Sequence, residues 1–298
     1  MASVVEKAGA LAVVSADPCY GACDMAFQDA QSLGADLLVH YGHSEMMRQE
    51  QVPTIYVEAK AVVSVKGTVK KALPLLKPWK KIGLVTTVQH VEMLSEARQT
   101  LLKAGKSLAI GDAGRTKYPG QVFGCDYSNA KAVVKDVEAF LFVGGGRFHA
   151  IGVALATAKP TVVADPYERR AYSVENEVKK IMKQRLASIN EAREAVKFGV
   201  LTGLKSGQKR LDDALWVKER LGEAGKKATL LALREVTPEV LMQFPTIEAF
   251  VNTACPRISL DDASKFRTPV LTLNETLVAL GESTWEELLQ KGWFEGST

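Results

Sequence analysis

The residues best suited to chemistry in this chain are its four cysteines. Cys19 and Cys23 lie in the stretch Ala16-Asp17-Pro18-Cys19-Tyr20-Gly21-Ala22-Cys23-Asp24, while Cys125 and Cys255 follow at domain-sized intervals. Thiolates are the preferred ligands of soft metal centres such as iron–sulfur clusters. A structural zinc site usually takes four ligands from close sequence pairs, which these long separations do not provide. The spacing therefore predicts one metal cluster to which three segments contribute.

Composition limits the kind of protein that carries these cysteines. With 298 residues and a mass of 32.3 kDa, two or three domains are expected. The net charge of +4 comes from interleaved acidic and basic residues, which does not favour a nucleic-acid partner. No apolar run reaches the roughly 18 residues that a membrane span needs, and Glu6 precedes the first apolar run where a signal peptide would be basic. We therefore expect a cytoplasmic protein whose cysteines are not paired in disulfides.

An internal repeat links the segments around Cys23 and Cys125. Four pairs of positions share one offset of 102 residues, so that this part of the match needs no gap. The pairs are Cys23 with Cys125, Asp24 with Asp126, Asp36 with Glu138, and Gly42 with Gly144. Each copy contains an apolar run that ends in glycine, which is typical of a buried strand.

A third copy follows residue 197, where 198–202 resembles 82–86 and 247–251 resembles 137–141. Strands that alternate with helical segments predict three related α/β domains with largely parallel sheets, at 1–79, 80–197 and 198–298. The first domain is expected to be N-terminally incomplete, because only six residues precede Lys7. A long amphipathic helix over 174–196 should bridge the second and third domains, a segment over 64–81 should join the first two, and a short helix should lie within 285–294.

The repeat distinguishes the cysteines from one another. Cys23 and Cys125 occupy equivalent loops, and Cys255 follows the strand of the third copy, aligned with Gly145 and His43. An approximate threefold arrangement would bring these loops to a common centre. Cys19 has no counterpart, so we interpret it as a small buried apolar residue. Cys19 and Cys23 also begin the C-x-x-x-C-x-x-C signature of ordinary radical S-adenosylmethionine enzymes, but Ala26 stands where the third cysteine should be.

Other chemically active residues give weaker signals. The glycine run that precedes Arg147 follows a strand and opens a helix, so its backbone N–H groups could hold a carboxylate or phosphate, although a tight turn explains it equally well. His40 is predicted to be a core residue and His43 to lie in a ligand loop. His90 is predicted near the start of a surface helix.

Four short motifs make the chain resemble one known family, the archaeal 2-(3-amino-3-carboxypropyl)histidine synthases of diphthamide biosynthesis. They are Tyr20-Gly21-Ala22-Cys23-Asp24, Gly145-Gly146-Arg147-Phe148-His149, Asp165-Pro166-Tyr167 and Asn252-Thr253-Ala254-Cys255-Pro256-Arg257. The resemblance implies three α/β domains arranged around a [4Fe-4S] cluster, each giving one cysteine. It names Cys23, Cys125 and Cys255 as the ligands, in agreement with the repeat. Relatives usually begin with an additional strand that this sequence lacks.

The resemblance also implies a reaction. Three thiolates leave one iron open to S-adenosylmethionine, whose sulfonium bond to the methionine γ-carbon is then cleaved by an electron from the cluster. The 3-amino-3-carboxypropyl radical adds to a histidine of translation elongation factor 2, and methylthioadenosine is released. Candidate substrate contacts are Gly146, Arg147, His149, Asp165 and Gln208. A homodimer and a separate electron donor are expected.

Two alternatives remain open from the sequence. A quinolinate synthase-like dehydratase also combines three α/β domains with a three-cysteine cluster, although its local motifs are absent. A non-catalytic iron–sulfur subunit or scaffold would use the cluster for structure or electron transfer. The role of Cys19 stays open as well, including that of a fourth, transient ligand.

Overall fold

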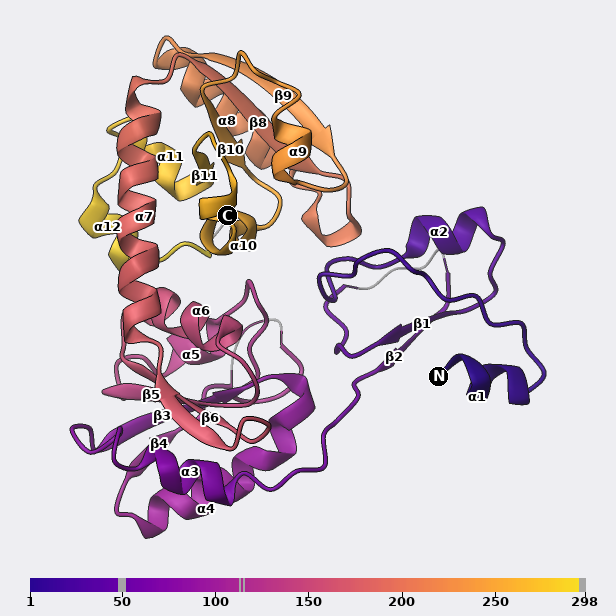
Figure 1. Ribbon diagram of the computed structural model, residues 1–298, viewed down its shortest axis with the longest axis vertical. Helices are drawn as coiled ribbons and strands as arrows, with labels where there is room; N and C mark the ends of the chain where they lie inside the picture. Colours follow the sequence, from indigo (N-terminus) through magenta and orange to yellow (C-terminus); the bar gives the residue numbers. More distant parts are fainter. Residues whose placement is uncertain (48–51, 113, 115, 295–298) are drawn as a thin grey trace.

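The computed structural model describes residues 1–47, 52–112, 114 and 116–294, which fold around three separate β-sheets. Figure 1 shows the two larger sheets joined along one side by a long helix, with the two-stranded sheet of the N-terminal segment on the opposite side. We call the parts built on these sheets the first, second and third units, in chain order. All strand pairs are parallel except one at the edge of the second unit.

The second unit has a five-stranded sheet with the order β4-β3-β5-β6-β7. Its strands are β3 (Lys81–Thr86), β4 (Ser107–Ala109), β5 (Ala139–Val143), β6 (Thr161–Asp165) and the antiparallel β7 (Arg170–Ser173). Helices α3 (Lys66–Ala72) and α4 (Leu94–Lys103) cover one face, α5 (Ser128–Ala132) and α6 (Phe148–Thr157) cover the other, and η1 (Val88–Met93) follows β3. Because β5 is buried on both faces, it is a continuous apolar run, as parallel sheets require.

The third unit has a four-stranded parallel sheet with the order β11-β10-β8-β9. Its strands are β8 (Lys197–Gly203), β9 (Lys227–Leu233), β10 (Ala249–Asn252) and β11 (Val270–Thr272). The helices are η2 (Ser206–Gln208), α8 (Leu211–Glu223), α9 (Pro238–Leu241), α10 (Pro256–Asp261), η3 (Ala263–Lys265), α11 (Leu273–Ala279) and α12 (Trp285–Lys291). The predicted long helix is α7 (Glu175–Glu194), which connects the second and third units (Figure 1), and the predicted C-terminal helix is α12.

The first unit is much smaller. It contains α1 (Ala2–Lys7), α2 (Phe27–Ser32) and a parallel pair of strands, β1 (Leu38–Tyr41) and β2 (Thr54–Val57). Among its described residues, one small apolar cluster is buried, formed by Met25, Phe27, Ala30 and Val52. In the repeat, the apolar run 11–14 corresponds to β4 and β9, which pair with β3 and β8 respectively. The described part of the first unit has no strand equivalent to β3 or β8. Leu11, Val13 and Val14 are accordingly exposed.

The three sheets confirm the α/β fold with largely parallel strands and related copies. The order β4-β3-β5-β6 matches β9-β8-β10-β11, and β1-β2 matches the pairs β5-β6 and β10-β11. One backbone hydrogen bond recurs in all three units, from the N–H of the first of these strands to a proline carbonyl. The pairs are Leu38 to Pro53 (2.9 Å), Phe140 to Pro160 (2.8 Å) and Phe250 to Pro269 (2.8 Å).

The domain boundaries at 79/80 and 197/198 stay predictions. Helix α3 packs against the sheet of the second unit, where Val65, Val69 and Ala72 join the same core as Ile82 and Leu84. This packing favours a first boundary closer to residue 64.

A buried ion pair fixes α7 to the third unit. The Arg185 guanidinium is 1% exposed and donates to both carboxylate oxygens of Glu275 at 2.7 Å. It also donates to the carbonyls of Ser259 and Val270, both at 2.8 Å, and Trp293 Nε1 donates to Glu275 Oε1 at 2.7 Å. Since every partner is inside the protein, removing one of them leaves a buried charge uncompensated.

We predict that Arg185→Met lowers the free energy of unfolding by about 3–5 kcal/mol, because Glu275 loses its counter-charge in a dry environment. Urea denaturation followed by circular dichroism measures this loss. The control is Arg220→Met on α8, whose ion pair with Glu282 is partly exposed, and its cost should be much smaller because solvent screens the pair. Equal losses of unfolding free energy in both variants would contradict the conclusion that the buried Arg185–Glu275 pair fixes α7 to the third unit.

Candidate metal centre

The loop that carries Cys255 is shaped by the residue that ends β10. Asn252 Nδ2 donates to the Cys255 carbonyl at 2.7 Å, and Asn252 Oδ1 accepts from the Ala254 N–H at 3.0 Å. Cys255 is the N-cap residue of α10, which begins with Pro256 because proline needs no hydrogen-bond partner for a backbone N–H. The thiol thus lies beyond the carboxyl end of a central parallel strand, where ligand sites of α/β sheets are found.

The loop that carries Cys125 connects β4 to α5 and lies beside the Cys255 loop. Both loops line one cavity of about 40 Å³, to which Cys125, Ala254 and Pro256 contribute. The Cys125 loop packs closely on the start of α6, since a Cβ atom on Gly124 would lie 2.7 Å from the Phe148 ring. The second and third units therefore present their cysteines to the same region.

The loop that carries Cys23 is held by the segment that follows β8. The Gly207 N–H donates to the Cys23 carbonyl at 2.7 Å, and Gln208 Nε2 donates to Cys23 Sγ at 3.5 Å. Lys205, whose side chain is 4% exposed, donates to Asp24 Oδ2 at 2.7 Å and lies 3.9 Å from the centre of the Tyr20 ring. Through these contacts a loop of the first unit is fixed on the third unit.

Cys23 and Cys255 interact electrostatically. Burial raises the pKa of Cys255, and the charge of Cys23 raises it further. Burial also raises the pKa of Tyr127, to which the charges of both Cys125 and Cys255 contribute. No disulfide joins any of the four cysteines in the chain.

The donor set suits an iron–sulfur cluster better than a single ion. Among the described residues, the three thiols do not form a group whose ligand atoms all lie within 4.8 Å of one another. In a cluster each thiolate binds a different iron, so the sulfur atoms are further apart than around one ion. Burial raises the pKa of Cys23, which the hydrogen bond from Gln208 partly offsets, so metal binding must displace its proton.

A buried guanidinium nitrogen of Arg257 without a hydrogen-bond partner also suits the binding of an anionic group. Arg257 is 5% exposed, donates through Nε to Asp261 at 2.7 Å and through Nη2 to the Phe148 carbonyl at 3.0 Å, and stacks on the Phe148 ring at 3.8 Å. Its Nη1 is buried without a hydrogen-bond partner. Because a buried donor without a partner is costly, this atom indicates that an acceptor completes the site. A cluster with thiolate ligands supplies such negative charge.

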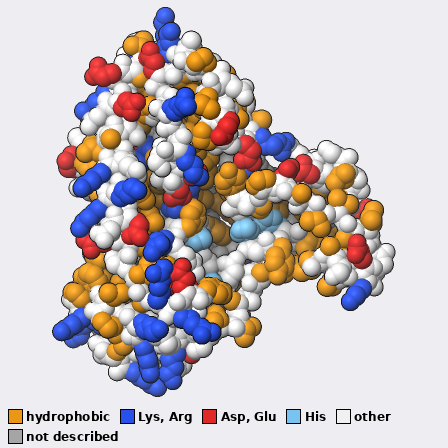
Figure 2. Space-filling model, viewed as in Figure 1, with side chains coloured by type: hydrophobic (Ala, Val, Ile, Leu, Met, Phe, Trp, Pro, Cys, Tyr) orange, Lys and Arg blue, Asp and Glu red, His pale blue; other side chains and the backbone are white. Residues whose placement is uncertain are grey.

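The chain has four histidines, and the histidine side chains visible in Figure 2 gather in the hollow between the first unit and the others. His40 is buried on β1, as predicted, and His43 follows in the next loop. His90 lies near the start of a helix as predicted, in η1 directly before α4, but its side chain is not at the surface, because it is 5% exposed and its Nε2 is 2.8 Å from Tyr167 Oη. Contact with Tyr167 of the same unit explains this burial.

Two candidate substrate contacts, Gly146 and Asp165, bond to each other. Asp165 Oδ2 accepts from the Gly146 N–H at 2.9 Å, and Asp165 Oδ1 accepts from the N–H groups of Tyr167 (2.9 Å) and Glu168 (3.0 Å). Burial alone would raise the pKa of Asp165, but these three hydrogen bonds outweigh it and lower the pKa. Asp165 therefore holds the glycine loop in shape before α6.

The other three candidates have different surroundings. Gln208 touches Cys23 directly, as described above. The His149 ring stacks on Phe142, and burial together with the Arg257 charge lowers the pKa of His149 to about 3, so the imidazole is neutral. Arg147 forms an ion pair with Glu177 of α7 at 3.0 Å and lies over the Tyr172 ring, which fixes it to the outer side of the loop.

Sequence reasoning missed several residues that shape this centre. The segment 203–209, which contains Lys205 and Gly207, is explained equally well from sequence as a flexible loop or as a substrate contact. The observed role of Lys205 depends on a contact with Asp24, 181 residues away in sequence, which no local pattern encodes. Arg257 was visible as the end of the motif that contains Cys255, but its burial beside Phe148 was not.

Comparison with known proteins decides the family. A family model for diphthamide synthesis proteins matches residues 1–289. The chain belongs to this family. The chain is 40% identical over 275 residues to the 2-(3-amino-3-carboxypropyl)histidine synthase of Pyrococcus horikoshii, a match that covers 91% of this chain and 79% of that protein. It is 30% identical over 291 residues to subunit 1 of the human synthase, covering 96% of this chain and 65% of the human protein.

Solved structures of the family agree with the fold. The crystal structure of Dph2 from Pyrococcus horikoshii with a 4Fe-4S cluster superimposes with a TM-score of 0.87 at 37% identity, covering 99% of this chain and 83% of that one. A second crystal structure of the same protein gives a TM-score of 0.86 at 38% identity, covering 95% of this chain and 81% of that one. Family membership favours the synthase over the quinolinate synthase-like alternative. Within the described residues, no helix is both long and apolar enough to span a bilayer.

We predict that Gly207→Ala lowers the iron content of the reconstituted protein. An added Cβ would lie 2.6 Å from the Cys23 Cα and 2.7 Å from the Cys23 Cβ, so the cysteine loop must move away from the third unit. Iron and sulfide analysis after anaerobic reconstitution measures the effect, which we expect to be a loss of about half or more because metal sites need precise ligand placement.

The matched control is Gly222→Ala, since a Cβ at this helical position meets nothing within 4 Å. This variant should bind iron like the unmodified chain and be more stable by up to about 1 kcal/mol. Full iron content in Gly207→Ala would show that the close contact with Cys23 does not position a ligand.

Proposed function

We propose that this chain transfers the 3-amino-3-carboxypropyl group of S-adenosylmethionine to a histidine of translation elongation factor 2, the first step of diphthamide synthesis. The proposal is supported by membership of this family together with the placement of the cysteine loops, since Gly207 of the third unit contacts Cys23 and Cys125 shares a cavity with the residues that flank Cys255. The relative from Pyrococcus horikoshii bears the name of this activity, and its crystal structure contains a 4Fe-4S cluster.

In this proposal Cys23, Cys125 and Cys255 hold the [4Fe-4S] cluster and leave one iron without a protein ligand. When bound, the cluster supplies the electron that breaks the sulfonium bond to the methionine γ-carbon. Arg257 contributes a fixed positive charge beside the thiolates, and its unpaired Nη1 donates to the anionic group.

The chain also orients S-adenosylmethionine. The N-terminal N–H groups of α6, a helix of ten residues, suit the methionine carboxylate, and Asp165 keeps the preceding Gly146 turn in place for this contact. His149 is neutral in its apolar surroundings, so it does not repel the positively charged sulfonium. Gln208 donates to the Cys23 sulfur and thereby fixes the orientation of this ligand. The ion pair between Arg147 and Glu177 is proposed to hold the glycine loop against α7.

The resemblance extends the proposal to assembly and location. A homodimer, an external electron donor and a cytoplasmic location are expected for an enzyme that modifies a translation factor. Light scattering at several protein concentrations tests the dimer directly.

We predict that the anaerobically reconstituted chain, given dithionite and S-adenosylmethionine, releases methylthioadenosine. The physical reason is selective placement of the γ-carbon bond, instead of the adenosyl bond, next to the reducing centre. Product chromatography with mass spectrometry distinguishes the two cleavage products. With elongation factor 2 present, its histidine should gain one 3-amino-3-carboxypropyl group.

The control is the Cys23→Ala, Cys125→Ala, Cys255→Ala triple variant under the same conditions, which should release neither product. Formation of 5′-deoxyadenosine, or no cleavage by a chain with full cluster content, would refute the proposed activity. Cleavage without transfer would show that elongation factor 2 is not the acceptor.

A further inference from the structure

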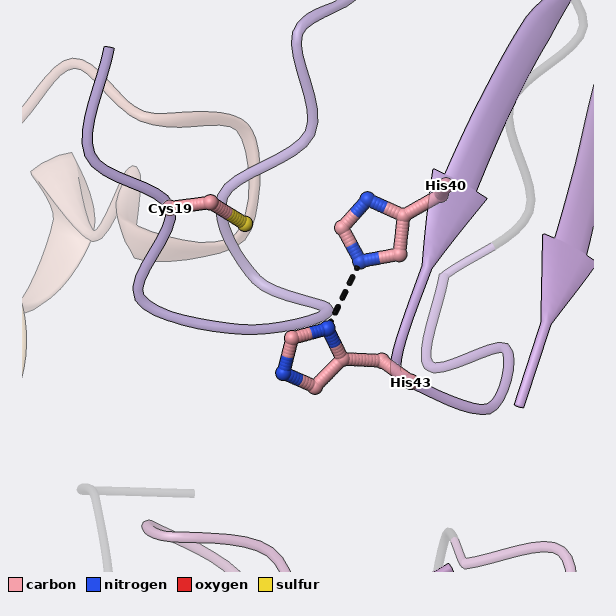
Figure 3. Close-up of side chains that lie close together, drawn as sticks. All are labelled: Cys19, His40 and His43. Atoms are coloured by element: carbon pink, nitrogen blue, oxygen red, sulfur yellow. Dashed lines mark hydrogen bonds between the residues drawn. The ribbon is translucent and has the colours of Figure 1, made fainter. Parts of the chain in front are cut away.

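A second group of potential metal ligands lies in the first unit. Cys19, His40 and His43 each offer one donor atom, and the three atoms lie within 4.8 Å of one another. Figure 3 shows the Cys19 thiol on its loop pointing toward the His40 ring on β1, with the His43 ring directly below. The His40 Nε2 and His43 Nδ1 atoms are 3.0 Å apart.

The distances are close to those of a mononuclear site. A tetrahedral zinc ion with Zn–N near 2.0–2.1 Å and Zn–S near 2.3 Å separates its ligand atoms by roughly 3.5 Å. The group therefore needs changes of up to about 1.3 Å in its donor separations to hold zinc. Cys19 is exposed and its Sγ lies 3.4 Å from the Asp24 carbonyl, so the loop already holds the thiol near the two rings.

The proposed transferase activity does not use these three residues. Cys19 has no counterpart in the repeat, so the symmetry that produces the other three cysteines does not explain it. His40 and His43 lie at the end of β1 and in the loop after it, separate from the cysteine loop in sequence. One thiol and two imidazoles from two different segments form the mixed sulfur and nitrogen set that zinc prefers.

The first unit also has a physical need for an additional link. Its described residues bury one small apolar cluster beside a two-stranded sheet, which is marginal for independent stability. Cys23, the cluster ligand of this unit, is only four residues from Cys19. A metal ion bound between the cysteine loop and the end of β1 would restrict the loop that positions Cys23.

We propose that Cys19, His40 and His43 bind a zinc ion that fixes the cysteine loop of the first unit to the end of β1. We assign the fourth position of the ion to water, since the carboxylate of Asp24, which follows the cysteine loop, is bonded to Lys205. This site is distinct from the cluster ligands and does not depend on the proposed activity.

The test uses the full chain with Cys23, Cys125 and Cys255 all replaced by alanine, so that no cluster ligand competes for the metal. Zinc is titrated against a chromophoric chelator, and cobalt is added separately to report ligand type from its absorption. We expect one zinc per chain, and a cobalt spectrum with a thiolate charge-transfer band and the strong visible absorption of tetrahedral geometry. Zinc should also slow the alkylation of Cys19 by iodoacetamide.

Three substitutions in this background identify the ligands. Cys19→Ser changes an exposed residue and should remove the charge-transfer band, and His43→Ala should weaken zinc binding by more than about 10-fold and abolish the protection of Cys19. His90→Ala, a buried histidine outside the group, should leave zinc affinity unchanged. Circular dichroism confirms that each variant is folded.

Absence of stoichiometric zinc binding in the background chain would overturn the proposal. Equal affinity in Cys19→Ser, His43→Ala and His90→Ala would overturn it as well. Because every measurement uses chain without cluster ligands, failure here leaves the proposed transferase activity untouched, and failure of that activity leaves this site untouched.

Discussion

The backbone contact between Cys23 and Gly207 is the constraint on which the metal centre depends. The second and third units share the long helix α7 and the buried Arg185–Glu275 pair, so their cysteine loops are placed by a continuous core. The first unit has only a small core of its own. Its cysteine reaches the centre because a residue without a side chain lets two backbones meet at 2.7 Å, with the Lys205–Asp24 ion pair beside them.

Parallel sheets explain why the three cysteine loops are suited to a shared metal centre. In each unit the cysteine loop lies near the carboxyl end of the strands, where loops of α/β sheets commonly form ligand sites. The same strand order recurs in the units, and so does the backbone hydrogen bond from Leu38, Phe140 and Phe250 to a proline carbonyl. Equivalent loops therefore lie at the same edge of each sheet. Arg257 adds a buried guanidinium nitrogen without a partner, which suits an anionic group. The repeat does not predict this residue.

The fold was largely predictable because the repeat leaves a direct trace in the sequence. The constant offset between Cys23 and Cys125 identified equivalent loops, and the apolar run at 139–143 identified a doubly covered strand. Side-chain environments were less predictable. The burial of His90 depends on Tyr167, and the contact of Gly207 with Cys23 joins different units, so both depend on packing between distant segments. The Cys19–His40–His43 group was not predicted, because Cys19 has no equivalent residue in the other copies of the repeat.

In the proposed metal centre, one thiol from each unit holds a single cluster. The most direct measurement is the iron content and electron paramagnetic resonance of four anaerobically reconstituted single variants. Cys23→Ala, Cys125→Ala and Cys255→Ala should each lose the stable cluster, because none of the remaining pairs can replace a ligand from a separate unit. Cys19→Ala should retain the cluster. Loss of the cluster in Cys19→Ala alone, with full occupancy in the other three variants, would contradict the account.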